Sequence, residues 1–385
     1  MTLDLVCRVL DNYGDIAVVW RLAQALVQDG PQDLRVRLLV DDWESFRVLN
    51  PTLAPGDRQT LFCSGGTVTA LGIAGQDPSD ERNFPADVLI EAFGAATPDP
   101  WLAAFLTAAK AEVGQGFPPR ILLHLEYLTA EAWSESYHLL PSPLGYPGVQ
   151  RYFFVPGFRP KTGGLVFTDF SAPPAPRGTE DWLMTLFAYE HDFTRFWEDL
   201  VAFLRERKQT ARVLVFAGRS RVGALRAWES VKAVHGEAGI TVVDQPFVDQ
   251  EAYTALLAAG DFHVVRGEES WVQALLSGRS FLWQAYLQPE GHQSVKVEAF
   301  LEVWSPWFDA EGATGREIFQ RVAREFRQMN RRVVDSDAEI PREGYRVFWE
   351  NRDLLERVGR AWASYLRKNA KLSLRLLEFL EKVRV

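Results

Sequence analysis

The chain has 385 residues, which at roughly 100–200 residues per domain is enough for two domains. Apolar residues make up 47% and charged residues 24%, which are values of a globular protein and exclude a disordered or low-complexity chain. The formal net charge is −9, from 42 Lys and Arg against 51 Asp and Glu, which argues against a protein that binds a nucleic-acid backbone.

The sequence also bears on the compartment. Its two cysteines, Cys7 and Cys63, exclude a disulfide framework and a four-ligand zinc site, and Cys7 is expected in the core because it lies in an apolar strand pattern. The first residues lack a basic region followed by a long apolar run, and no stretch of about 20 apolar residues occurs, so neither a signal peptide nor a membrane span is predicted. We therefore expect a cytoplasmic protein.

The beginning of the chain shows a strand–loop–helix–strand pattern. Residues 3–10 form an apolar run rich in β-formers, residues 16–28 carry apolar side chains at helical spacing, and residues 35–40 form the next strand. This pattern is typical of a βαβ unit with a parallel sheet. Further strands are expected at residues 88–90, 121–125 and 152–155.

Residues 156–181 are rich in Pro, Gly, Ser and Thr and are the best candidate for a domain boundary. A second α/β cycle follows, so the sequence predicts an α/β protein with two facing Rossmann-like domains and a C-terminal helical tail. Strands are expected at residues 182–189, 213–216, 241–243, 262–265 and 281–284, and helices at residues 193–207, 251–257, 270–276, from 317 onward, and at 354–385 as one long helix or two shorter ones.

In parallel sheets, ligands bind beyond the carboxyl ends of the strands, which directs attention to the loops at residues 11–15 and 266–270. No G-x-G-x-x-G motif follows the first strand, and the P-loop and G-x-S-x-G motifs are absent, so dinucleotide, P-loop NTPase and serine hydrolase functions lose their main support. Asp335 and Asp337 form a D-x-D pattern that could ligate a divalent cation. It lies in a late polar turn rather than after a buried strand, and we interpret it as a solvated turn.

Asp11 and Asp15 flank the first of these loops. Their carboxylates are four residues apart across a tight turn and could converge on one substrate, where one of them could act as general base. In the alternative interpretation, Asp15 caps the helix that begins near Ile16.

The second loop ends a strand and opens a helix. Backbone N–H groups at a helix N-terminus bind phosphate, and Arg266 would add a fork of donors for a diphosphate. Glu268 and Glu269 would repel a diphosphate, so at least one of them should face a sugar hydroxyl or another donor. Alternatively, the segment is an ordinary turn capped by Ser270.

Aromatic residues and histidines are less informative. Tyr189, Phe247 and Tyr286 lie at or near strand ends, where they could stack on a base, although each is by itself more typical of the core. The six histidines show no i, i+4 metal-ligand pair, and His124 is expected to be a core residue.

In their order, these segments resemble the elongation factor P arginine rhamnosyltransferases (EarP family), bacterial inverting enzymes of the two-Rossmann GT-B type. The ordered set is specific and runs through nearly the whole chain. The matching blocks are residues 9–16 (VLDNYGDI), 20–22 (WRL), 90–94 (IEAFG), 125–133 (LEYLTAEAW), 140–143 (LPSP), 152–158 (YFFVPGF), 162–165 (TGGL), 246–248 (PFV), 266–270 (RGEES) and 283–300.

The resemblance implies an activity. The donor would be dTDP-β-L-rhamnose, the acceptor one arginine on a loop tip of folded elongation factor P, and the product an α-rhamnosyl-arginine formed without a metal or other cofactor. The modified factor relieves ribosomes stalled on polyproline. The acceptor domain would be residues 1–179 completed by a helix at 358–385, the dTDP-rhamnose domain would be residues 180–357, and the two would close about residues 156–181 and the terminal helix.

The resemblance also implies roles for residues. Asp15 would be the general base, Asp11 would bind and orient the guanidinium, and Glu268 matches a position that the family needs for activity. The family usually has Asp where this chain has Glu269. The acceptor-binding residues would be Asp11, Asn12, Tyr13, Gly14 and Asp15, and the donor-binding residues Tyr189, Phe247, Gln250, Arg266, Glu269, Ser270 and Tyr286.

Two other classes of function stay open at this point. The scaffold would also suit a nucleotide-sugar transferase with a lipid, glycan or small-molecule acceptor, or an epimerase. The first domain shows no basic, aromatic run of the kind that a membrane-bound acceptor would favour. A non-catalytic nucleotide- or protein-binding module would tolerate loss of Asp11, Asp15 and Glu268, and the presence of all three argues against it.

Overall fold

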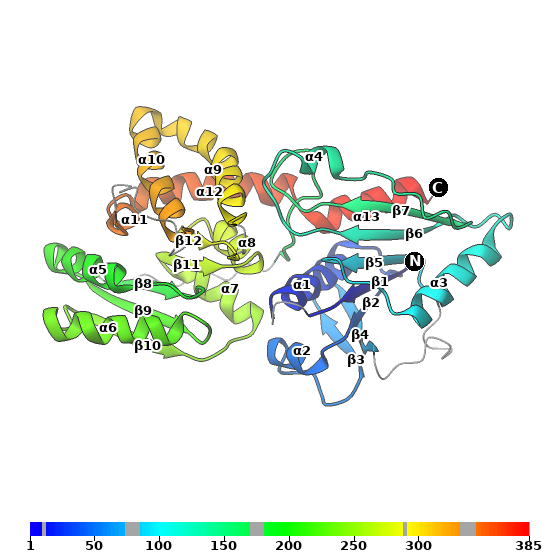
Figure 1. The fold of residues 1–385 in the computed structure, drawn as a ribbon, viewed down its shortest axis with the longest axis horizontal. Coiled ribbons are helices and arrows are strands. Elements are labelled where there is room, and N and C mark those ends of the chain that lie inside the picture. The colour runs from blue at the N-terminus through cyan, green and yellow to red at the C-terminus, as the bar shows by residue number, and fades with distance from the viewer. Residues whose placement is uncertain (10–12, 74–84, 170–180, 288–290, 332–343, 385) are drawn as a thin grey trace. The chain divides into compact units, whose positions relative to one another are not determined.

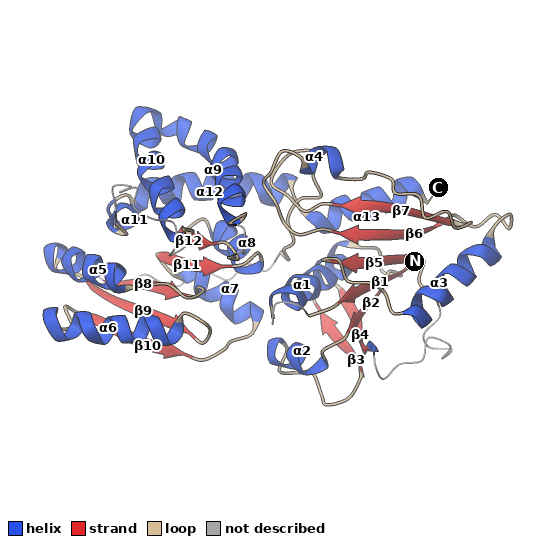
Figure 2. Cartoon of the chain, viewed as in Figure 1, coloured by secondary structure: helices blue, strands red, loops and turns tan. Residues whose placement is uncertain are grey.

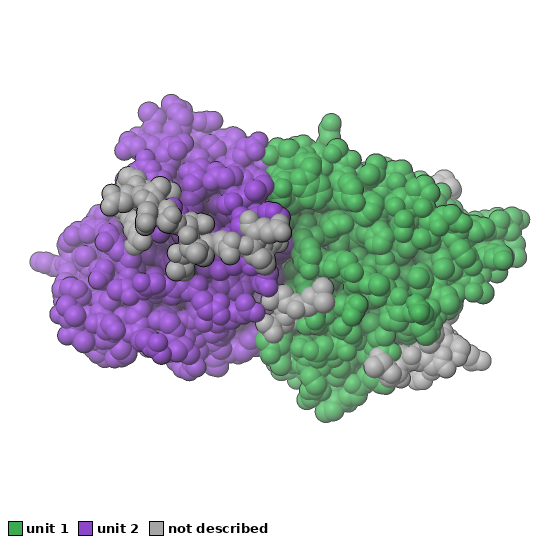
Figure 3. All heavy atoms as spheres, in the orientation of Figure 1, with its two compact units in different colours: residues 1–169, 368–385 green, residues 170–367 purple. Residues whose placement is uncertain are grey.

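The computed structural model describes residues 1–9, 13–73, 85–169, 181–287, 291–331 and 344–384. The chain divides into two compact units, which Figure 3 colours separately: residues 1–169 with 368–385 (unit 1), and residues 170–367 (unit 2). The sequence analysis placed the two boundaries at 179–180 and 357–358. The second boundary lies inside one continuous helix, α12 (Arg352–Asn369), so the sequence contains no break there to mark it.

Unit 1 is built on a seven-stranded sheet with the strand order β3-β4-β2-β1-β5-β6-β7 (Figure 1). Its neighbouring strands are parallel except for the hairpin of β3 and β4. The strands are β1 (Thr2–Cys7), β2 (Arg35–Val40), β3 (Arg58–Cys63), β4 (Gly66–Gly72), β5 (Val88–Ala92), β6 (Arg120–Leu125) and β7 (Val149–Phe154). The helices are α1 (Gly14–Asp29), α2 (Trp43–Leu49), α3 (Asp99–Glu112), α4 (Ser134–Tyr137) and α13 (Leu372–Val383).

Helices cover both faces of this sheet, as Figure 2 shows. The apolar face of α1 shares a core with the sheet and with the C-terminal helix α13, to which it contributes Ile16 and Leu26 and α13 contributes Leu376. On the other face, Trp101 and Phe105 of α3 pack against a second set of strand residues. Burial on both faces accounts for the near-continuous apolar runs of the central strands.

The C-terminal segment returns to unit 1 through a break between α12 and α13. Leu165 donates its backbone N–H to Ala370 at 2.7 Å, and Leu372 donates to the Leu165 carbonyl at 2.8 Å. The buried Lys371 ammonium lies 2.8 Å from Asp29 of α1 and 2.7 Å from Asp169. The region expected to hold one long helix or two shorter ones therefore contains two.

Unit 2 holds a five-stranded parallel sheet with the order β10-β9-β8-β11-β12. The strands are β8 (Asp181–Leu186), β9 (Thr210–Phe216), β10 (Ile240–Gln245), β11 (Phe262–Arg266) and β12 (Ser280–Gln284). The helices are α5 (Thr194–Arg207), α6 (Arg221–His235), α7 (Gln250–Ala259), α8 (Glu269–Ser277), α9 (Gln293–Trp304), α10 (Gly312–Met329), α11 (Arg346–Glu350) and α12, with a 3-10 segment at Ser305–Glu311.

Aromatic side chains dominate the core of unit 2. The rings of Trp271 and Trp283 stack with centroids 3.7 Å apart, and Phe300 meets Trp271 edge to face at 4.9 Å. Such aromatic pairs stabilise the core beyond the area that they bury. The α8 and α9 helices are therefore held firmly against the end of the sheet that carries the second loop of interest.

The α/β class and the parallel sheets expected from the sequence are confirmed, and every strand expected from the sequence is present. The structure adds the β3–β4 hairpin and helices α2, α3, α4, α6 and α9, and the C-terminal helical region of unit 2 begins at Gln293 rather than at residue 317. Cys7 is fully buried, as predicted. In the described ranges, no helix has the length and apolar character to cross a membrane.

Candidate active site

The loop from β1 into α1 carries the residues expected to bind an acceptor. Asp11 and Asn12 lie outside the described residues. Tyr13 is 37% exposed at the position before the helix, and Asp15 is 5% exposed in the first helical turn. Because Tyr13 and not Asp15 occupies the N-cap position, the alternative that Asp15 caps this helix is wrong: the helix begins two residues earlier than the apolar spacing indicated.

Asp15 therefore lies where a negative charge is stabilised, at the positive end of a 16-residue helix. Burial raises the pKa of the Cys7 thiol at the end of β1, and the charges of Asp15 and Asp41 raise it further. Among the described residues, a Cβ added at Gly14 would meet no atom within 4 Å. The first turn of α1 thus carries a buried carboxylate, that of Asp15.

The next strands of the sheet bring further ionisable groups to the same edge. Glu91 of β5 pairs in register with His124 of β6, and the His124 Nδ1 lies 3.1 Å from the Glu91 carboxylate. Thr97 donates both its backbone N–H and its hydroxyl to Glu91, at 2.9 and 2.8 Å. Burial raises the pKa of Glu91, but the bonds from His124 and Thr97 outweigh it and hold the pKa below its ordinary value.

His124 is thus not the core residue that was expected. Its side chain is 26% exposed and belongs to an ionisable pair rather than to the apolar core. Glu126 follows at the end of β6, where burial raises the pKa of its carboxyl against the opposing effect of His124. The alternation of side chains along a strand could not predict that His124 is partly exposed, because it does not show at which residue near the carboxyl end the burial of the strand stops.

In unit 2, the end of β11 carries Arg266. Its guanidinium carbon lies 4.6 Å from the ring centroid of Phe187 and 4.8 Å from that of Tyr189, both in the segment that follows β8. Stacking on two rings orients the flat guanidinium while its N–H groups remain able to donate. The sequence prediction that Arg266 and Tyr189 share a site is consistent with these contacts.

The turn after Arg266 opens α8. Gly267 has φ +64°, a left-handed conformation that glycine adopts without strain, and a Cβ there would lie 3.5 Å from the Tyr189 hydroxyl. Glu268 occupies the N-cap position without a side-chain cap, and Glu269 and Ser270 form the first turn of the helix. Ser270 is 6% exposed and lies inside the helix, so the alternative of a turn capped by Ser270 is wrong.

The aromatic residues divide into one buried and two exposed members. Tyr189 is 5% exposed, its backbone N–H bonds the Gln284 side chain at 2.8 Å, and its ring meets Tyr286 edge to face at 5.6 Å. Tyr286 is 46% exposed and Phe247 is 39% exposed, so neither is a core residue. Large exposed aromatic side chains beside a strand end suit a stacking role better than a packing role.

Helix α7 brings Gln250 toward the same region. Gln250 is buried at the first position of α7, one turn before Tyr253, whose ring contacts Phe187 at 5.8 Å. Burial raises the pKa of the Tyr253 hydroxyl; the charge of Glu269 raises this pKa further, and the charge of Arg266 lowers it. Within unit 2 the structure therefore gathers segments from β8, α7, β11 and α8 at one edge of the sheet.

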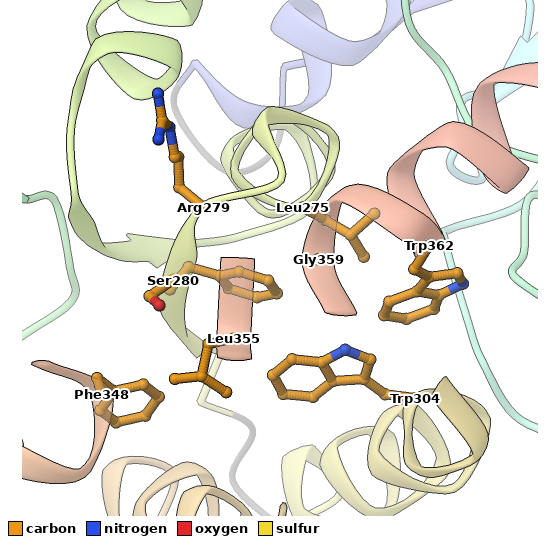
Figure 4. A pocket seen from close by; sticks show the side chains of 9 residues that line it. Leu275, Arg279, Ser280, Trp304, Phe348, Leu355, Gly359 and Trp362 are labelled. Carbon is orange, nitrogen blue, oxygen red and sulfur yellow. The ribbon is translucent and has the colours of Figure 1, made fainter. Parts of the chain in front are cut away.

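A separate cavity in unit 2 does not belong to this edge (Figure 4). It has a volume of about 10 Å³, which is about the room that one water molecule requires. The Ser280 hydroxyl and the Trp304 indole N–H, both of which line it, make no hydrogen bond within the described residues. We interpret this cavity as a place for a buried water and not for a substrate.

No group of three or more His, Cys, Asp or Glu side chains arranged for a metal ion occurs in the described part of the chain. The D-x-D of Asp335 and Asp337 lies outside the described residues.

Comparison with known proteins gives the decisive observation. Residues 3–381 match the family model of the elongation factor P (EF-P) rhamnosyltransferase EarP. The chain belongs to this family.

Individual relatives agree with this. A protein-arginine rhamnosyltransferase of Pseudomonas putida is 36% identical over 333 residues, covering 78% of this chain and 80% of that protein. One of Pseudomonas aeruginosa is 34% identical and covers 82% and 85%. A solved structure described as the structural basis for EarP-mediated arginine glycosylation of EF-P is 21% identical, has a TM-score of 0.52 and covers 99% of each chain, which shows a common fold. As a member of the EarP family, the chain is a glycosyltransferase of the GT-B type.

The sequence analysis did not predict four residues of unit 2 that lie beside the predicted donor-binding residues. They are Phe187, Arg219, Tyr253 and Gln284. A signal for two of them was available: Phe187 directly follows β8, and Arg219 lies in the short segment between β9 and α6, the kind of position that singled out the other two loops.

Proposed function

We propose that this glycosyltransferase transfers L-rhamnose from dTDP-β-L-rhamnose to an arginine side chain of elongation factor P, with inversion and without a metal. The observation that carries the proposal is the family match over residues 3–381. Relatives described as protein-arginine rhamnosyltransferases, and the related structure described in terms of arginine glycosylation of EF-P, supply the acceptor.

The chemistry of the acceptor explains the need for carboxylates. A guanidinium is a weak nucleophile because its lone pairs are delocalised and it is protonated, with a pKa above about 12. Asp15, buried at the start of α1, can orient one nitrogen and accept its proton as the new bond forms. In this proposal Asp11 binds the guanidinium, and Tyr13 and Gly14 lie beside it.

The transfer is a single displacement. The guanidinium nitrogen forms a bond to the anomeric carbon as the bond from that carbon to the diphosphate oxygen breaks, and the nitrogen's proton goes to Asp15. Attack from the face opposite to the leaving group inverts the configuration. The released dTDP takes up the electron pair of the broken bond and with it negative charge.

The proposed donor site lies at the carboxyl edge of the unit 2 sheet. Arg266 and the backbone N–H groups at the start of α8 would stabilise the charge of the departing diphosphate, with the hydroxyls of Tyr189 and Ser270. Phe247 would line the thymine pocket, and Gln250 would bond the base or ribose. In the same proposal Tyr286 contributes to the pocket through its contact with Tyr189, and Glu269 through its backbone N–H.

Glu268 has a separate role in the proposal. Its carboxylate would accept a hydrogen bond from a hydroxyl of the sugar or support the loop. It precedes the first turn of α8, beside the proposed diphosphate site, where its negative charge is better placed toward a sugar hydroxyl than toward phosphate.

The direct test is an incubation of the purified chain with dTDP-rhamnose and elongation factor P, followed by mass spectrometry of the intact factor and its peptides. We expect one added deoxyhexose, located on arginine. Reactions with UDP-glucose as donor, and with the factor's target arginine changed to lysine, serve as controls. Absence of the adduct in reactions with the folded chain would refute the proposed reaction. Transfer to a lipid, glycan or small molecule instead would favour the alternative acceptor classes.

A further inference from the structure

The loop that joins β9 to α6 passes beside Arg266. A Cβ added at Gly218 would lie 3.4 Å from the Phe187 ring and 3.7 Å from an Arg266 guanidinium nitrogen. The next residue, Arg219, is exposed. No motif singled out this loop, but it follows the carboxyl end of a parallel strand, as the Arg266 loop does.

Arg219 and Arg266 both contact the ring of Tyr189. The guanidinium carbon of Arg219 lies 5.8 Å from the ring centroid, and that of Arg266 lies 4.8 Å from it. Two arginines from different loops are therefore within reach of the same ligand beside this ring. A diphosphate, with several charged oxygens, is an anion that two guanidinium forks can bind together.

The backbone around Arg219 is well fixed. Ser220 is buried, and its hydroxyl accepts a hydrogen bond from the Ala188 backbone N–H at 3.2 Å, which ties this loop to the one that carries Tyr189. The neighbouring Arg221 is engaged elsewhere, since its Nε lies 2.6 Å from Asp244. Of these two arginines, Arg219 is the one whose guanidinium lies beside the Tyr189 ring.

We infer that Arg219 is a second phosphate-binding residue, which acts with Arg266 on the diphosphate of the nucleotide-sugar donor. This inference rests on the proposed function and adds to it a residue that the family resemblance did not supply. The pair holds the diphosphate from two loops, and the extra positive charge stabilises the leaving group as the bond to the sugar breaks.

Binding measurements can isolate this role. The variant Arg219→Ala is compared with the parent chain for dTDP by titration calorimetry and for thymidine by ligand-observed NMR. We expect the Kd for dTDP to rise about tenfold, the size of one charge-assisted contact, and the Kd for thymidine to stay within about twofold. Arg219→Lys, which keeps the charge and loses the fork, should fall between the two.

Arg226→Ala is the matched control. Arg226 is an exposed arginine of α6, the helix that follows the same loop, and its replacement removes the same charge at a helical position where Ala is well tolerated. It should bind dTDP as the parent does. In turnover assays, Arg219→Ala should lower kcat/KM for the donor and leave the KM for the acceptor protein unchanged.

The outcomes separate the two claims. Equal losses for dTDP and thymidine would mean that Arg219 only supports the fold of the loop, and no loss for dTDP would mean that it does not bind phosphate; either result overturns the inference while rhamnosyl transfer by the parent chain stands. If the parent binds UDP or GDP better than dTDP and Arg219→Ala weakens that binding, the donor assignment fails and the phosphate role survives. If the parent binds no nucleoside diphosphate, both fail.

Discussion

At the scale of the residue, the candidate site consists of charged side chains placed where the backbone already favours them. Asp15 lies at the positive end of α1, and Arg266 stacks on two aromatic rings at the end of β11. The contacts with the two rings orient Arg266 before any ligand arrives, which lowers the cost of ordering it during binding. In the proposed function, the reactivity of the site depends on single carboxylates and guanidinium groups, so single substitutions should change it.

The two aspartates of the first loop should differ in their kinetic effects. If Asp15 is the general base, Asp15→Asn should lower kcat by about 10²–10⁴-fold, because the amide cannot take the proton. Asp11→Asn should act mainly by raising the KM for the acceptor protein. Steady-state rhamnosyl transfer measures both, with the exposed Asp33→Asn as a control for loss of a surface charge. Near-normal turnover in both loop variants would rule out this role for the loop.

At the scale of the element, strand ends and helix starts create the site, and buried polar groups fix the elements in place. His263 in β11 is fully buried and bonds the Thr185 hydroxyl through its Nδ1 at 2.9 Å. Lys371, at the start of α13, bridges Asp29 and Asp169. Neither group belongs to the proposed chemistry, but each holds an element from which the site is built.

Burial lowers the pKa of His263 to about 3, so it stays neutral in the folded chain when the unfolded chain takes up a proton near pH 6.5. The folded state then binds fewer protons, and stability falls as pH decreases below about 6.5, by roughly 2 kcal/mol at pH 5. Urea unfolding at pH 7 and pH 5 measures this loss. In His263→Asn, the fall in the free energy of unfolding between pH 7 and pH 5 should be smaller by about 2 kcal/mol. The exposed His235→Gln should show the same fall as the parent chain. An unchanged pH dependence in His263→Asn would contradict the prediction.

The C-terminal helix gives a second prediction at this scale. Lys371→Met removes the cation and leaves the Asp29 side chain, which is 9% exposed, without its charged partner. The free energy of unfolding should therefore fall by about 3–5 kcal/mol. Lys382→Met, which breaks an exposed pair with Glu378 on the same helix, should cost under about 1 kcal/mol. Chemical denaturation of both variants tests this. Similar losses in the two would show that the buried bridge does not anchor α13.

At the scale of the whole molecule, the chain uses two separate sheets, one parallel and one parallel except for the β3–β4 hairpin, and its C-terminal residues return to unit 1. The proposal assigns the acceptor to unit 1 and the nucleotide sugar to unit 2. This division lets the carboxylates of one unit serve a cation while the arginines of the other serve an anion. The proposed chemistry thus relies on the protein's own charges in place of a metal ion.

A metal-free reaction has a simple consequence. If Arg266 and the helix amides stabilise the leaving group, as proposed, rhamnosyl transfer should continue in an excess of EDTA at a rate within about twofold of that in Mg²⁺. Transfer assayed with and without the chelator measures it, and a metal-dependent nucleotide-sugar transferase assayed in parallel shows that the chelator is effective. Loss of activity that only a divalent cation restores would contradict the metal-free proposal.

Much of this arrangement could be predicted from the sequence. The buried strands appear as apolar runs, and β1 is followed by α1, and β11 by α8, as expected. The hairpin of β3 and β4 was not predicted, because β3 lies at the sheet edge and buries one residue, Leu61, so its sequence lacks an apolar run. Helix starts were misplaced by one or two residues, which changed the positions of Asp15 and Ser270 from cap to first turn.

The sequence by itself determined the fold class, the two-sheet organisation and the family, because these depend on periodicity and on ordered motifs that are local in the chain. The tertiary structure alone decided which distant residues meet: that Arg219 and Arg266 approach one tyrosine ring, that His124 pairs with Glu91, and that Lys371 joins α13 to α1. The physical reason is that such contacts depend on strand order and register, which bring together residues whose separation along the chain carries no signal.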